Sequence, residues 1–168
     1  MAIVTKKGDK GKTLTLSSKR LDKDNILIET VGIVDELSAF LGLSKATIKC
    51  KRRKKIISDI QKDLSIVSSE ISLGKSDNFK LDRKITKDRV VSIDKLIEEF
   101  EKKYKIEFFL TLDSNSSSAS LNVARTISRR LERRVVSLNK KKMVFNRYIL
   151  IYLNRLSDLL FLLSRSFE

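Results

Sequence analysis

The chain has 168 residues, of which 36 are Lys or Arg and 21 are Asp or Glu, so its formal net charge is +15. It contains no His and a single Cys, which excludes His-based acid–base chemistry, Ser-His-Asp triads, His metal ligands, internal disulfides and multi-thiolate metal sites. The length predicts one domain with a real core, and the charge favours polyanionic partners such as nucleotides or nucleic acid.

The first half of the chain predicts a loop followed by two helices. Residues 1–24 contain breaks rich in Gly, Asp and Ser, and the Thr/Leu alternation at 13–16 is typical of an extended loop or a short strand. Apolar residues then recur with helical spacing from 25 to about 49 and again from about 51 to 73. Gly74 is expected to end the second of these helices.

The next segments predict a polar connection and two more helices. Residues 74–86 are polar, and the charged stretch from about 87 to 104 carries a narrow apolar stripe of helical period. Residues 113–118 are rich in the types that begin helices and should start a fourth helix, which runs to about 138.

A basic turn at 139–142 and a capping Asn146 should precede a fifth helix that runs to the C-terminus. The connections between the helices are short, which forces most neighbours to be antiparallel. We therefore expect an all-α fold, a five-helix up-and-down bundle over 25–168 with an irregular N-terminal loop segment, and one domain over 1–168.

The sequence predicts a cytoplasmic protein. Residues 1–12 are polar and basic, without the apolar stretch of a secretory signal. The most apolar segment, 148–167, is long enough to cross a bilayer, but polar and charged residues interrupt it, so a buried bundle helix is preferred. A single Cys suits a reducing compartment.

The segment 7–13 ends in Gly-Lys-Thr, like a P-loop. A P-loop needs a first Gly at the position of Lys6 and a helix after Thr13, and the sequence offers neither. Gly8 and Gly11 still permit positive φ angles and a close backbone approach to an anion. Composition alone leaves an anion-binding loop and a floppy basic terminus about equally supported.

The predicted fourth helix carries an unusual arginine pattern. Arg125, Arg129 and Arg133 recur at one-turn intervals on one face, and Glu132 lies beside them. Three stacked guanidinium groups repel one another unless a carboxylate or a phosphate chain lies between them. The alternative is a solvated or ion-paired face. Asn154 lies on a helix expected to pack nearby. Its side chain can both donate and accept hydrogen bonds, as recognition of a base or a ribose requires.

Asp35 falls near the apolar stripe of the first predicted helix. We expect its carboxylate to be at least partly buried and therefore to need a partner. Pairing with one arginine of the fourth helix would position that arginine and leave the others for a ligand.

Taken in order, these segments resemble the PduO-type ATP:corrinoid adenosyltransferases, also called cob(I)alamin adenosyltransferases. The matching stretches cover nearly the whole chain, at 5–13, 23–24, 29–37, 60–64, 123–136 and 154–158. The resemblance implies a five-helix bundle that forms a homotrimer, with ATP and reduced corrinoid bound between subunits. It implies transfer of the 5′-deoxyadenosyl group of ATP to cobalt(I) of a corrinoid, which forms adenosylcobalamin and releases triphosphate. Mg²⁺ on the phosphates and a corrinoid reductase as a partner are also implied.

The resemblance also implies roles for residues at matching positions. The N-terminal residues that would wrap or face ATP are Thr5, Lys6, Lys7, Gly8, Thr13 and Lys23. The helical residues that would hold the nucleotide are Arg129, Glu132, Arg133 and Asn154. The group at the reacting centre comprises Arg129 together with Asp35 and Arg125, which resemble an intersubunit ion pair. Phe109 matches an aromatic residue that packs near the lower face of the corrin and helps to keep cobalt four-coordinate.

The chain departs from the family pattern at three places. Lys6 replaces an Arg, Ser17 and Ser18 replace a glycine pair, and 111–114 replace a Pro-Gly-Gly run. The last change touches the side of the site that would handle the corrinoid.

Two alternatives remain at the level of sequence. A basic helical nucleic-acid-binding protein could use the cationic runs at 49–55 and 139–142, although only 7% of the residues are aromatic and could stack on bases. The other alternative is a degenerate corrinoid-binding relative with weak activity.

Overall fold

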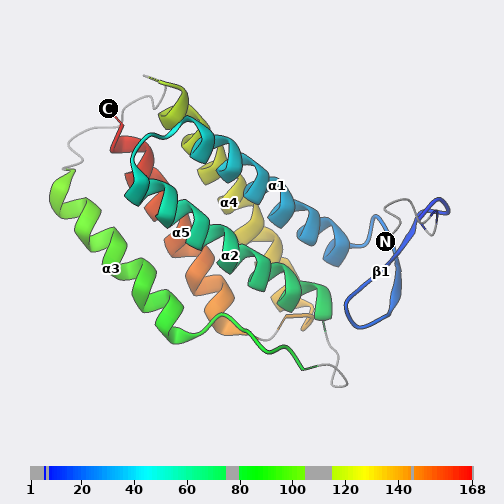
Figure 1. Ribbon diagram of the computed structural model, residues 1–168. Coiled ribbons are helices and arrows are strands. Elements are labelled where there is room, and N and C mark those ends of the chain that lie inside the picture. The colour runs from blue at the N-terminus through cyan, green and yellow to red at the C-terminus, as the bar shows by residue number, and fades with distance from the viewer. Residues whose placement is uncertain (1–5, 7, 75–79, 105–114, 145, 168) are drawn as a thin grey trace.

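A computed structural model describes residues 6, 8–74, 80–104, 115–144 and 146–167 of the chain. Its elements are β1 (Lys12–Leu14), β2 (Arg20–Asp22), α1 (Ile26–Thr47), α2 (Lys51–Leu73), α3 (Lys87–Lys103), α4 (Ser116–Lys140) and α5 (Arg147–Arg165). The helices run up and down side by side, and the β1–β2 hairpin projects beyond the end where α1 begins (Figure 1). The predicted five-helix up-and-down bundle is confirmed.

The helix ends lie close to the predicted positions because local side chains determine them. The side-chain oxygens of Asn25, Asn115 and Asn146 accept hydrogen bonds from the first backbone amides of α1, α4 and α5, which otherwise lack partners. Gly74 ends α2 with a φ of +57°, and its amide donates to the carbonyl of Ile71. The basic turn predicted at 139–142 begins later, because α4 continues to Lys140.

The N-terminal segment is more regular than predicted. β1 and β2 pair antiparallel, with Thr13 opposite Leu21. In the turn between them, the amide of Thr15 donates to the carbonyl of Lys19, and Ser18 adopts a φ of +58°. The sequence did not reveal β2, because no glycine marks this positive-φ position as a hairpin turn.

The core lies among α1, α2, α4 and α5, and α3 packs against α5 from outside and adds Val90, Ile93 and Phe100 to it. α1 packs on α2 and α4, and α4 packs on α5. The predicted apolar stripe of the last helix, made of Leu153, Leu156, Leu160 and Leu163, is fully buried. None of the helices in the described parts of the chain has the length and apolar content needed to cross a membrane.

A buried polar contact ties three helices together. Asp63 of α2 accepts a hydrogen bond from the hydroxyl of Tyr152 on α5 at 3.0 Å, and Arg89 of α3 forms an ion pair with the same carboxylate. Burial raises the pKa of Asp63 although both partners favour its charged form. Burial also raises the pKa of Tyr152.

The Asp63 carboxylate should make stability depend on pH. Native Asp63 holds its proton more tightly than an unfolded chain with the ordinary pKa of 3.8. Its contribution to the free energy of unfolding therefore falls as the pH rises from that value through the raised native pKa. We expect the stability of the wild type minus that of Asp63→Asn, measured by urea unfolding, to decrease from about pH 3 to about pH 7. A difference that increases over this range would show that the ion pair with Arg89 outweighs burial.

Candidate functional site

Two arginines of α4 are paired with carboxylates of α1. Arg130 forms an ion pair with Glu36, and Nη2 of Arg134 lies 2.8 Å from Oε1 of Glu29. All four side chains are partly exposed, so each pair contributes little to stability, about 1 kcal/mol or less. These pairs join α4 to α1, and they neutralise the two arginines of α4 that lie beside α1.

The three arginines predicted to share a face, which we call the arginine face, are Arg125, Arg129 and Arg133. Arg125 is half-buried, and its Nε donates to the side-chain oxygen of Asn122 at 2.9 Å. Burial, together with the charge of Arg129, lowers the pKa of Arg125, although a guanidinium group stays protonated. Arg129 and Arg133 are exposed, and neither side chain has a hydrogen bond or ion pair with another described residue. No carboxylate of the described residues forms an ion pair with the arginine face.

The carboxylate next to the arginine face is bonded to α5. Nδ2 of Asn154 donates to Oε1 of Glu132 at 3.2 Å, and Nη1 of Arg155 donates to Oδ1 of Asn154 at 2.8 Å. The expectation that Asn154 lies near the arginine helix is therefore confirmed. Glu132 accepts this bond from an amide, and it forms no ion pair with Arg129 or Arg133 in the described chain.

Gly8 and Lys23, two of the predicted N-terminal site residues, lie close together at the base of the hairpin. A Cβ atom added to Gly8 would lie 3.1 Å from Nζ of Lys23, so the glycine lets this ammonium group approach the backbone closely. The amide of Lys23 donates to the carbonyl of Gly11, which has a φ of +70°. Lys6 is exposed with a φ of +54°, and Thr13 is half-buried in β1.

Three predicted site residues, Thr5, Lys7 and Phe109, lie outside the described residues. The stretch at 111–114, where the chain departs from the family pattern, lies outside them as well.

The described chain does not join the two halves of the predicted phosphate cradle. The hairpin is anchored to the end of α2, where the amide of Leu16 donates to Oγ of Ser72 at 3.2 Å. No hydrogen bond or ion pair between described residues links the segment 6–24 to the arginine face. Figure 1 shows the hairpin beyond the end of the bundle, away from the middle of α4.

The expected burial of Asp35 is wrong. Asp35 is exposed and has no ion pair with a described residue, Arg125 included. It follows the buried Val34 but lies at the edge of the α1–α2 contact, on a groove of about 320 Å³. Small side chains on the α2 side keep this groove open, namely Ser65, Ser68, Ser69 and Ser72.

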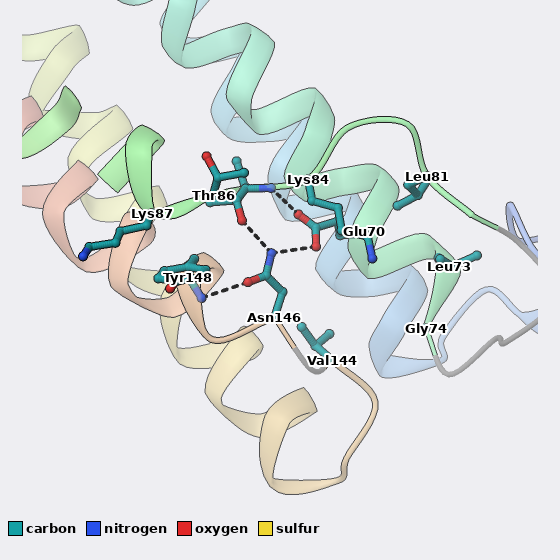
Figure 2. A pocket seen from close by; sticks show the side chains of 11 residues that line it. Glu70, Leu73, Gly74, Leu81, Lys84, Thr86, Lys87, Val144, Asn146 and Tyr148 are labelled. Atoms are coloured by element: carbon teal, nitrogen blue, oxygen red, sulfur yellow. Dashed lines mark hydrogen bonds between the residues drawn. The ribbon is translucent and has the colours of Figure 1, made fainter. Parts of the chain in front are cut away.

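A larger cavity, of about 530 Å³, lies elsewhere and contains none of the predicted site residues. It is formed where the end of α2, the segment before α3 and the start of α5 meet. Figure 2 shows the amide of Asn146 directed at Glu70, which also accepts a hydrogen bond from the amide of Ile85 at 2.7 Å. Asn146 thus caps α5 and ties it to α2, and sequence patterns gave no sign of this second role.

Comparisons with known proteins agree with one another. The family model for cobalamin adenosyltransferase matches residues 3–167. A corrinoid adenosyltransferase of Citrobacter freundii is 31% identical over 97% of this chain and 93% of its own length. One of Bacillus subtilis is 33% identical over 98% of this chain and 86% of its own length.

Solved structures give the same result for the fold. A variant PduO-type ATP:corrinoid adenosyltransferase from Lactobacillus reuteri, complexed with cobalamin and ATP, matches with a TM-score of 0.89 and 28% identity. The match covers 98% of this chain and 92% of the other.

Removing an arginine from the arginine face should not destabilise the protein when no ligand is present. Arg129→Gln and Arg133→Gln each remove a repulsive charge without breaking an ion pair, so we expect the thermal midpoint to stay constant or rise. The matched control Arg134→Gln breaks the pair with Glu29 and should lower the midpoint by about 1–2 °C. A drop of several degrees in Arg129→Gln would instead mean that this guanidinium group has a structural partner.

Proposed function

Because the chain belongs to the cobalamin adenosyltransferase family, we propose that its ATP lies between the segment around Gly8 and Lys23 and the arginine face of α4. The enzyme transfers the 5′-deoxyadenosyl group of ATP to cobalt(I) of a corrinoid and releases triphosphate. The product is adenosylcobalamin when the corrinoid is cobalamin.

One observation carries the placement of the phosphates. Of four neighbouring arginines on α4, Arg130 and Arg134 are paired with carboxylates, whereas Arg129 and Arg133 are exposed and unpaired within the described chain. A triphosphate supplies the missing negative charge, and a guanidinium group can bind two of its oxygens at once.

The reaction requires no nucleophile from the protein. The electron pair of cobalt(I) forms the new bond to C5′ of the ribose, and the pair of the broken C5′–O bond leaves with the triphosphate. The protein must hold C5′ in line with cobalt and neutralise the charge that grows on the departing triphosphate. A chain without His can do both.

We assign the residues as follows. Arg129 stabilises the departing triphosphate, and Arg133 and Lys23 assist it. Glu132 and Asn154 contact the nucleotide from the helices. The N-terminal contacts with ATP come from Thr5, Lys6, Lys7, Gly8 and Thr13. Phe109 packs near the lower face of the corrin.

The site is completed by a second subunit in this proposal. The segment around Gly8 and the arginine face do not meet within one described chain, and a homotrimer with sites between subunits would bring them together. Asp35 is exposed on α1 and can reach Arg125 of a neighbouring subunit. Apolar side chains that such contacts could cover are exposed on the hairpin and on α1, namely Leu14, Leu16 and Leu43.

Mg²⁺ would arrive with the nucleotide. The described residues contain no group of three or more carboxylate or thiolate side chains that could hold a metal ion. Mg²⁺ commonly binds substrate phosphates and keeps several waters, so the triphosphate itself is its proposed ligand. We also propose a cytoplasmic location and a corrinoid reductase as the source of cobalt(I).

Arg129→Ala tests the central assignment. In an anaerobic spectral assay with reduced corrinoid, ATP and Mg²⁺, the wild type should convert cobalt(I) to the alkylated corrinoid. Arg129→Ala should lower turnover by about 10²–10³-fold, as removal of one well-placed oxyanion donor does. Arg134→Ala, which removes a nearby arginine already paired with Glu29, should stay within about twofold because an exposed pair contributes little. A normal rate in Arg129→Ala would contradict the assignment.

A charge exchange tests the pair between subunits. Asp35→Arg and Arg125→Asp should each lower activity at least about tenfold, because each places like charges together at the interface. The double variant restores opposite charges and should recover part of the loss, with the trimer followed by light scattering. If the double variant forms the trimer of the wild type but recovers no activity, the two residues do not form a pair.

A further inference from the structure

A row of four polar side chains crosses three helices. Asp94 of α3 lies 3.0 Å from Nε of Arg155 on α5. Nη1 of Arg155 donates to Oδ1 of Asn154 at 2.8 Å, and Nδ2 of Asn154 donates to Oε1 of Glu132 on α4 at 3.2 Å. The row therefore begins on α3, which contributes none of the assigned site residues, and ends beside the arginine face.

The chemistry of the two flanking groups fixes the orientation of the amide between them. A guanidinium group can only donate hydrogen bonds, and a carboxylate can only accept them. If the amide of Asn154 were turned over, its NH₂ group would face Arg155 and its oxygen would face Glu132. Both contacts would be repulsive, so only one orientation is compatible with these neighbours.

Arg155 can fix the orientation of the Asn154 amide only if its own guanidinium group is held in place. Its side chain is 42% exposed, and a long exposed side chain samples many rotamers. Asp94 accepts from Nε of the guanidinium while Nη1 bonds Asn154. Two bonds from one rigid planar group hold it more firmly than one bond from a flexible ammonium group could.

We propose that Arg155 and Asp94 are positioning residues for Asn154. They hold the amide so that one N–H bonds Glu132, which leaves a second N–H and one oxygen lone pair for the nucleotide. This inference rests on the proposed function, in which Asn154 and Glu132 contact ATP. The fixed donor and acceptor improve ATP binding and do not act on the departing triphosphate.

The kinetic consequence is a change in KM without a matching change in kcat. Loss of an interaction made equally in the ground state and the transition state raises KM alone. Arg155→Lys keeps the charge, but one nitrogen cannot replace the two bonds of the guanidinium, so KM for ATP should rise about 3- to 10-fold. Asp94→Ala removes only the support and should raise KM about 2- to 3-fold, with kcat within about twofold of the wild type for both variants.

Two further single variants separate positioning from general stability. Glu99→Ala breaks the ion pair between Glu99 of α3 and Arg52 of α2, which joins the same helix to the bundle outside this row. It should lower the thermal midpoint about as much as Asp94→Ala and leave KM for ATP unchanged. Asp94→Glu, which keeps the carboxylate, should recover the KM of the wild type. If Glu99→Ala raised KM as much as Asp94→Ala, the role of Asp94 would be only structural, and the proposal would be overturned.

Combination with Asn154→Ala distinguishes the possible failures. Asn154→Ala should itself raise KM for ATP, and adding Arg155→Lys or Asp94→Ala should then have no further effect, because residues that act through one group are not additive. If Asn154→Ala leaves KM unchanged, both the site assignment and the positioning role are wrong. If it raises KM but Arg155→Lys and Asp94→Ala do not, or if their effects persist in its background, only the positioning role is overturned.

Discussion

The proposed site depends on like charges held at one-turn intervals on α4. Arg129 and Arg133 lack a carboxylate partner among the described residues, and the charge of Arg129 also contributes to lowering the pKa of Arg125. A helix with such a face is stable because its opposite face is buried, with Leu121, Leu131 and Leu138 fully covered by the bundle. Burial of the apolar face therefore keeps α4 helical although its exposed face carries unpaired positive charges, which attract an anion.

Neighbouring arginines on the same helix differ in role because their positions differ by about 100° around the axis. Arg130 and Arg134 meet Glu36 and Glu29 of α1 and help to fix the helix pair. In the proposed function, the unpaired face binds the triphosphate of ATP. The nucleic-acid alternative drew on the cationic runs at 49–55 and 139–142, which lie outside this face, and it is family membership that favours the enzyme.

Much of the fold was predictable because its signals are local. Apolar residues at helical spacing, Asn25, Asn115 and Asn146 at the helix starts, and Gly74 at an end each act within a turn or two of chain. The β2 strand was missed because no glycine marks the turn before it. The tie from Asp63 to Tyr152 was missed because its partners lie 89 positions apart.

For the site, the sequence by itself determined which residues share a helix face, because a regular helix converts spacing into direction. It placed Arg125, Arg129 and Arg133 together and supplied the motifs that resemble one enzyme family. Only the tertiary structure decided which charges are neutralised, since ion pairs join residues as far apart as Glu29 and Arg134. It also decided that Asp35 is exposed and that Asn154 lies between Arg155 and Glu132, because packing between helices sets those distances.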